Sequence, residues 1–337
     1  MVRASVNEIE KIERGYWGRK CREIVSDWRL YVMLVPLLFF LVCWKYLPIG
    51  SMVMSFKYYE AASNKQVYGS NWVGLFYFDY IMFGSEYLKF WKAFRNTFTL
   101  SFYGMVFGFP FPILLALLFS EIKSTWYRAT VQIFCYLPKF VSTVVVTSIT
   151  ILLLRPSLEN GGVITQQPGP ITSLIQAITG QTGLDIMKDP KCFRAVYQVT
   201  GICETAGYGS IVYFAAILGI SPTNYEAARI DGASKMQQIR YVTIPGMTAT
   251  LVIMLILDIG KLLTIGYEKV ILLQGTNSDV LFETAETIST YVWHMNLGTG
   301  VNKAAGAAAD MLNSVISMLL VIGSNQIARK VSSTSLY

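Results

Sequence analysis

Long runs of apolar residues, separated by polar stretches, dominate this 337-residue sequence. A helix that crosses the hydrocarbon core of a bilayer, about 30 Å thick, needs about 20 predominantly apolar residues. Six stretches of the sequence reach this length. We therefore expect transmembrane helices at residues 30–56, 93–120, 127–154, 192–218, 244–265 and 304–326.

Composition supports an all-α membrane protein with six transmembrane helices. Hydrophobic residues make up 53% of the chain and charged residues only 15%, whereas soluble domains carry about 25% charged residues. The net charge of +7 does not indicate nucleic-acid binding, because the basic residues lie between apolar runs rather than along one solvated face. The lipid bilayer is the partner that explains both features.

The distribution of Lys and Arg predicts the orientation of the chain. One set of loops holds 14 basic residues in 74 positions, and these loops are residues 1–30, 121–128, 219–243 and 327–337. The alternate set holds 8 in 110 positions, at residues 57–91, 155–191 and 266–303. Because basic loops stay in the cytoplasm, both termini are expected there. The predicted organisation is a cytoplasmic leader (1–29), a six-span transmembrane domain (30–326) and a cytoplasmic tail (327–337).

The leader is too long and too charged for a signal peptide, and no small-residue cleavage site follows the first apolar run, so that run is interpreted as an uncleaved anchor. The leader itself mixes charges with Ile, Tyr and Trp. This pattern fits an amphipathic helix on the cytoplasmic surface, and equally a frayed polar segment.

Several kinds of chemistry are not supported by the sequence. The five cysteines have no paired spacing, and His294 is the only histidine, so neither a disulfide framework nor a metal cluster is predicted. The chain lacks the GxxxxGK[ST] phosphate loop, so it is not expected to bind ATP. No catalytic constellation is found, and no catalytic residue, metal or cofactor is assigned.

The cytoplasmic loop 219–245 is the most informative polar segment. Ser221 followed by Pro222 is typical of a helix start, and residues 223–230 can form two helical turns. Gly232 is expected to end this helix, since glycine tolerates the left-handed conformation found there. A second short helix is predicted at 233–241, and the proline at 245 then opens the fifth span.

The two predicted helices of this loop, joined at Gly232, form an elbow. The first helix of the elbow suits docking of another protein. Ala227 and Ala228 allow close approach, Glu226 offers an anionic anchor, and Arg229 lies next to them. On physical grounds alone, an ordinary interfacial loop helix explains the same residues. The spacing of the residues adds a second argument. Glu226-Ala227-Ala228 is followed by three residues, Gly232, nine residues and then Val242-Thr243-Ile244-Pro245. This pattern resembles the EAA signature of binding-protein-dependent ABC importer permeases.

Other segments resemble the carbohydrate permeases related to the maltose system. These are YEAARIDGAS (225–234), RNT (95–97), YEKVILLQ (267–274), ETISTYVWHMNLGTG (286–300) and NSVISMLLVIGSNQIARK (313–330). The resemblance covers most of the chain, and it is weakest in the first 25 residues and in 155–190.

The resemblance implies a type I ABC importer permease core in a bacterial inner membrane. It implies pairing with a second related permease, two ATPase subunits that carry ATP-Mg, and an extracellular or periplasmic solute-binding protein that delivers a carbohydrate. By the same resemblance the elbow contains the coupling helix that contacts an ATPase. The coupling residues would be Glu226, Ala227, Ala228, Arg229, Gly232 and Pro245.

Candidate residues for the substrate pathway follow from the cost of burying charge in a membrane. Asp258 and Lys261 lie one turn apart in the fifth predicted span, where they either neutralise each other or line the pathway; Glu204 in the fourth span is similar. Tyrosines that could stack on a sugar are Tyr208, Tyr213 and Tyr267, although most membrane aromatics serve packing. Lysines inside the spans favour an acidic sugar, such as a uronate-containing oligosaccharide.

Rival classes explain less of the sequence. A secondary transporter or channel without an ATPase predicts internally symmetric halves, which the sequence does not show, and it gives no reason for the Glu226 elbow. An ABC exporter is disfavoured because its membrane domain is commonly fused to an ATPase and lacks this elbow.

Overall fold

A computed structural model describes residues 26–58, 70–156, 158–160, 163–180, 185–275, 278–297 and 302–331. The predicted leader helix lies almost entirely outside these residues. The described part is helical, apart from the hairpin β1 (Leu158–Asn160) and β2 (Val163–Gln166) and an isolated bridge between Lys57 and Trp72. The predicted all-α class is thus confirmed, apart from a small hairpin that the sequence analysis missed.

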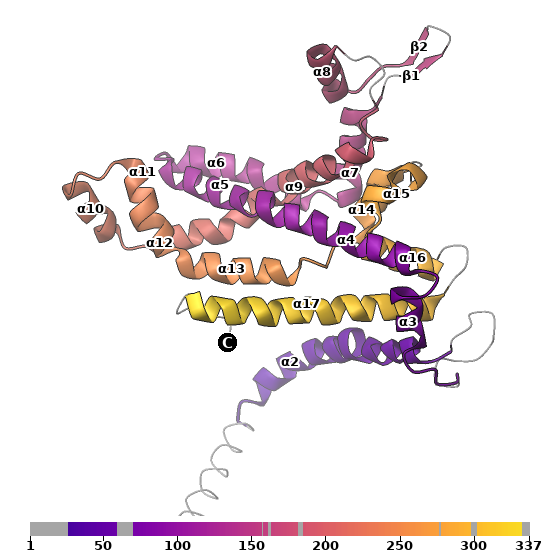
Figure 1. The fold of residues 1–337 in the computed structure, drawn as a ribbon. Coiled ribbons are helices and arrows are strands. Elements are labelled where there is room, and N and C mark those ends of the chain that lie inside the picture. Colours follow the sequence, from indigo (N-terminus) through magenta and orange to yellow (C-terminus); the bar gives the residue numbers. More distant parts are fainter. Residues whose placement is uncertain are drawn as a thin grey trace, which may run out of the picture.

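Within the part of the chain that the structure describes, four helices are long and apolar enough to cross a membrane: Trp28–Phe56, Tyr87–Glu121, Pro190–Leu218 and Lys303–Ile327. The first is composed of α2 (Trp28–Leu41), η1 (Val42–Tyr46) and η2 (Leu47–Phe56), and the second of α4 (Tyr87–Tyr103), η4 (Gly104–Gly108) and α5 (Pro110–Glu121). The other two correspond to α9 (Pro190–Leu218) and α17 (Lys303–Val331). Figure 1 shows α13 running alongside α17, and α5 alongside α9.

The remaining two predicted spans are not continuous helices. Residues Thr125–Phe140 and Thr143–Leu154 meet at 98°, and Lys235–Gly246 and Thr248–Gly260 meet at 65°. The first pair consists of α6 (Thr125–Tyr136), η5 (Leu137–Phe140) and α7 (Thr143–Leu154), and the second of α11 (Lys235–Gln238), η6 (Ile239–Thr243), α12 (Ile244–Gly246) and α13 (Thr248–Gly260). Six spans result only if each bent pair counts as one.

A proline lies two or three residues before each bend. Pro138 and Pro245 each stand at the second position of a short helix, where the missing N–H and the ring disfavour continuation of the preceding helix. Ser142 then starts α7 by accepting a hydrogen bond from the Val144 amide, while Met247 leaves the helical region before α13.

Short elements gather at the two ends of the bundle. The helices α3 (Phe76–Met82), α15 (Ser278–Ala285) and α16 (Ile288–Leu297) lie at one end, and α10 (Pro222–Ile230) lies at the other (Figure 1). The hairpin and α8 (Pro170–Thr179) project away from the bundle beyond α7 (Figure 1). The helix α14 (Tyr267–Gln274) follows α13.

Small residues permit the closest helix contacts. A Cβ on Gly207 of α9 would overlap the Cys135 carbonyl of α6. On α17, four alanines are buried in a cluster with aromatic residues of α3 and α4, and these are Ala304, Ala305, Ala308 and Ala309. Close approach through small residues is the usual way helices associate in membranes, where lipid competes equally for apolar side chains.

Candidate functional site

The predicted elbow is present between α9 and α13. Its first helix, α10, covers Pro222–Ile230 and ends at Gly232, whose φ of +78° lies in the left-handed region. The Gly232 amide donates to the Arg229 carbonyl at 3.0 Å and the Ala233 amide to the Ala228 carbonyl at 2.9 Å. These bonds satisfy carbonyls at the helix end, and they require the glycine conformation that the sequence predicts.

Two details of the elbow differ from the sequence prediction. Ser221 precedes α10, but its hydroxyl makes no cap and instead bonds the Thr223 hydroxyl at 2.8 Å. The second arm is not one helix over 233–241: α11 covers only Lys235–Gln238 and continues as a π-helix. The start of α11 is fixed by reciprocal bonds between Ser234 and Gln237, a capping box that sequence inspection had not found.

One face of α10 is available to a partner. Glu226, Ala227 and Arg229 are exposed, and no residue of α10 is buried. Ala228 is half-buried against the rest of the elbow, and Pro245 is exposed where α12 begins the turn into α13. The exposed face combines a carboxylate, small side chains and a guanidinium, which is a surface that another protein can approach closely.

A cavity of about 480 Å³ lies between α4, η4, η5, α9 and the end of α13. Four of the six predicted pathway residues line it, namely Tyr208, Tyr213, Asp258 and Lys261. The other two do not line it. Tyr267 is exposed at the start of α14, and Glu204 pairs with a lysine of α14.

Asp258 and Lys261 are not an ion pair in the structure. Asp258 is in the last turn of α13, and Lys261 follows the end of that helix. The described residues include no salt bridge for either side chain, although both line the cavity. A third charged residue, Lys139 of η5, also lines it. The sequence analysis did not single out this lysine for the pathway, because nothing along the chain shows that η5 and α13 line the same cavity.

Glu204 instead pairs with Lys269 of α14. The Nζ and Oε2 atoms are 3.2 Å apart, with side chains 12% and 11% exposed. The same Nζ lies 5.3 Å from the ring centre of Tyr197, which lines the cavity. A pair formed by residues 65 positions apart cannot be inferred from local spacing, so sequence reasoning missed it.

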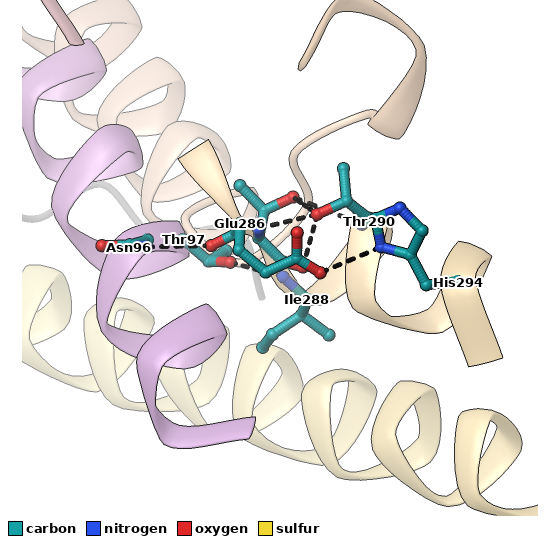
Figure 2. A network of polar contacts seen from close by, with 7 residues as sticks. Asn96, Thr97, Glu286, Ile288, Thr290 and His294 are labelled. Atoms are coloured by element: carbon teal, nitrogen blue, oxygen red, sulfur yellow. Dashed lines mark hydrogen bonds and ion pairs between the residues drawn. The ribbon is translucent and has the colours of Figure 1, made fainter. Parts of the chain in front are cut away.

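A second polar network joins α4 to the start of α16 (Figure 2). The Ile288 amide donates to Thr97 Oγ1 at 2.9 Å, and Asn96 Nδ2 donates to the Glu286 carbonyl at 3.1 Å. His294 Nδ1 lies 3.2 Å from Glu286 Oε1, and this hydrogen bond raises the pKa of His294. The network holds the break between α15 and α16 against α4, at the end of the bundle opposite α10.

Comparison with known proteins agrees with this architecture. No family model matches the chain. Protein LplB of Bacillus subtilis (strain 168) is 32% identical over 308 residues, covering 91% of each chain. The polygalacturonan/rhamnogalacturonan transport system permease protein YteP of the same organism is 32% identical over 316 residues, or 94% of this chain and 92% of YteP.

A solved structure is similar in both fold and sequence. It comes from a bacterial ABC transporter involved in the import of the acidic polysaccharide alginate. The TM-score is 0.78 at 32% identity, over 93% of this chain and 99% of that one. The protein is therefore a membrane-embedded transport permease. The chain belongs to the carbohydrate-type permeases of ABC importers, as the EAA-like spacing indicates.

Proposed function

We propose that this chain forms half of the translocation pathway for an acidic oligosaccharide. The observation that carries the substrate class is the cavity, which presents the ammonium groups of Lys139 and Lys261. Neither lysine has a salt bridge to any described residue. Both lysines are exposed at the cavity, and a uronate carboxylate would supply the opposite charge for a charge-assisted hydrogen bond.

The cavity also offers surfaces for the sugar rings. Tyr197 and Tyr208 contribute aromatic rings, and Gln198 and Thr205 contribute polar groups. Mostly apolar walls with a few placed polar groups are usual for small-molecule sites. The named functions of similar proteins support an acidic substrate, since one is a permease of a polygalacturonan/rhamnogalacturonan transport system and another belongs to an alginate importer.

The energy would enter through the elbow. In this proposal two ATPase subunits hold ATP-Mg, and one of them contacts Glu226, Ala227, Ala228 and Arg229 of α10, while Gly232 and Pro245 fix the shape of the elbow. A second related permease completes the pathway, and a solute-binding protein delivers the sugar; a solved relative contains an alginate pentasaccharide-bound periplasmic protein. The elbow and both termini would be cytoplasmic, as the basic loops predict.

Uptake by the complete transporter tests the substrate class. The assembly is purified from native membranes and reconstituted in liposomes. The solute-binding protein is added, and both sugars are assayed under the same conditions. Oligogalacturonate uptake is compared with uptake of a neutral maltooligosaccharide of equal length. We expect ATP-dependent uptake of the acidic sugar only. Uptake of the neutral sugar alone would contradict the proposal.

Variants then test the two lysines. Lys139→Gln and Lys261→Gln are each expected to raise the KM for oligogalacturonate about tenfold or more, because a hydrogen bond to a charged group contributes about 1.5–3 kcal/mol. Lys89→Gln is the control, since Lys89 is 57% exposed and pairs with Glu86 away from the cavity. Unchanged KM values in both cavity variants would exclude these lysines from recognition.

A further inference from the structure

The helix α10 has few attachments to the rest of the protein. None of its nine residues is buried, and only Tyr225 and Ala228 are half-buried. Ile230 at its end is 87% exposed. A helix that is pushed by a partner transmits the movement only through such attachments, so the few that exist determine how stiff the elbow is.

One side-chain hydrogen bond crosses the elbow from arm to arm. Tyr225 Oη and Thr243 Oγ1 are 3.1 Å apart. Thr243 is 3% exposed, at the end of η6, and its hydroxyl also lies 3.4 Å from the Gln238 carbonyl. Among the hydrogen bonds of the described residues, this is the side-chain bond that links α10 to the second arm.

The base of the elbow is closed by a tight contact. A Cβ added to Gly246 would lie 2.6 Å from Cδ1 of Ile220, so the backbone of α12 fits directly against the Ile220 side chain. The two arms therefore touch at the base and again one turn into α10. By contrast, the ion pair between Lys235 and Glu121 of α5 is 62% and 44% exposed, and exposed pairs of this kind contribute little.

We propose that Tyr225 and Thr243 are positioning residues that make the elbow a stiff lever, with the Ile220–Gly246 contact as its base. The hydrogen bond fixes the angle between α10 and the segment that leads into α13. Movement of α10 is then passed to α13, whose end contributes Asp258 and Lys261 to the cavity. This inference rests on the proposed function of α10 as the ATPase contact.

The test measures coupling in the complete transporter. In Tyr225→Phe and Thr243→Val, the two helices remain connected by backbone but lose the bond between the arms. We expect both variants to keep their ATPase subunits on purification and to hydrolyse ATP, while sugar imported per ATP falls about fivefold to tenfold, as expected for loss of one partly buried hydrogen bond. Thr243→Ser keeps the hydroxyl and is expected to restore coupling.

Tyr241→Phe is the matched control. It likewise removes one phenolic oxygen from the elbow, here from η6 in the second arm, and Tyr241 is 68% exposed with no hydrogen bond of its hydroxyl to a described residue. Normal sugar uptake per ATP in Tyr225→Phe would overturn the proposal, and so would loss of the ATPase from that variant, because the residue would then serve docking. If Glu226→Lys keeps its ATPase and transports normally, the assignment of α10 as the ATPase contact fails, whatever the amount of sugar imported per ATP in the Tyr225 and Thr243 variants.

Discussion

His294 is the only histidine in the sequence, which makes its titration easy to isolate. Its pKa is raised, chiefly by the hydrogen bond to Glu286. A raised pKa in the folded state means that the charged histidine stabilises the fold. This contribution is complete below the ordinary histidine pKa of about 6.5 and disappears as pH rises through the higher folded-state value.

We therefore expect the unfolding temperature of the purified protein to fall as pH rises from about 6.5 through this window. Thermal unfolding in detergent, measured across pH 5.5–9 for the native protein and for His294→Gln, isolates the effect because other titrating groups are common to both. For the variant, we expect the unfolding temperature to fall less steeply with rising pH, because the histidine contribution is absent. An identical pH dependence in the two proteins would contradict a stabilising Glu286–His294 pair.

The residues of the cavity show which site features a sequence can reveal. Asp258 and Lys261 could be predicted because charges within an apolar run are unusual wherever that run folds. Lys139 could not be assigned to the cavity, because its position depends on the bend after η5. Glu204 was singled out as a charge within an apolar run, but its partner Lys269 lies on a different helix, and only the fold brings the two together.

At the level of elements, the packing of α9 against α6 depends on one glycine. A Cβ at Gly207 would overlap the backbone carbonyl of Cys135, and backbone cannot yield as a flexible side chain can. Gly207→Ala is expected to lower stability by about 1–3 kcal/mol, the usual cost of overpacking, or to prevent assembly. Thermal unfolding and the monodisperse fraction after purification measure the loss.

Gly323→Ala on α17 is the control for this prediction. Nothing lies within 4 Å of a Cβ at Gly323, and alanine is the better helix former by about 1 kcal/mol. This variant is expected to be at least as stable as the native protein. Equal stability of the two alanine variants would show that α6 and α9 can separate without cost.

The six apolar runs show what hydropathy can and cannot predict about the transmembrane helices. All six apolar runs are helical within the described residues, because only helices and closed barrels satisfy the backbone in lipid. The bends of 98° and 65° were not predicted, since an apolar run has the same composition whether it is straight or broken. Pro138 and Pro245 lie close to the two breaks, but a proline in a sequence does not specify the angle of a bend.

For the whole molecule, both helices that flank the elbow, α9 and α13, also line the cavity. The thirteen residues of α13 span about 20 Å at 1.5 Å per residue, from the Pro245 turn to Asp258 and Lys261. Moving a two-state equilibrium from 1:99 to 99:1 takes about 5.5 kcal/mol of differential interaction. A helix can transmit such an energy only if its attachment is rigid, which is the role assigned above to Tyr225 and Thr243.

If energy passes from α10 to the cavity, as proposed, reversing a charge on α10 should disrupt ATPase binding and sugar uptake. Glu226 is exposed on α10, so Glu226→Lys should leave folding and membrane insertion unchanged. At an interface, placing like charges together costs several kcal/mol, so we expect loss of the ATPase subunits on purification and loss of sugar uptake. Asp79→Lys reverses an exposed charge on α3, at the opposite end of the bundle, and should retain both. Normal uptake by Glu226→Lys would show that α10 is not where the energy enters, since no other change to the pathway accompanies that substitution.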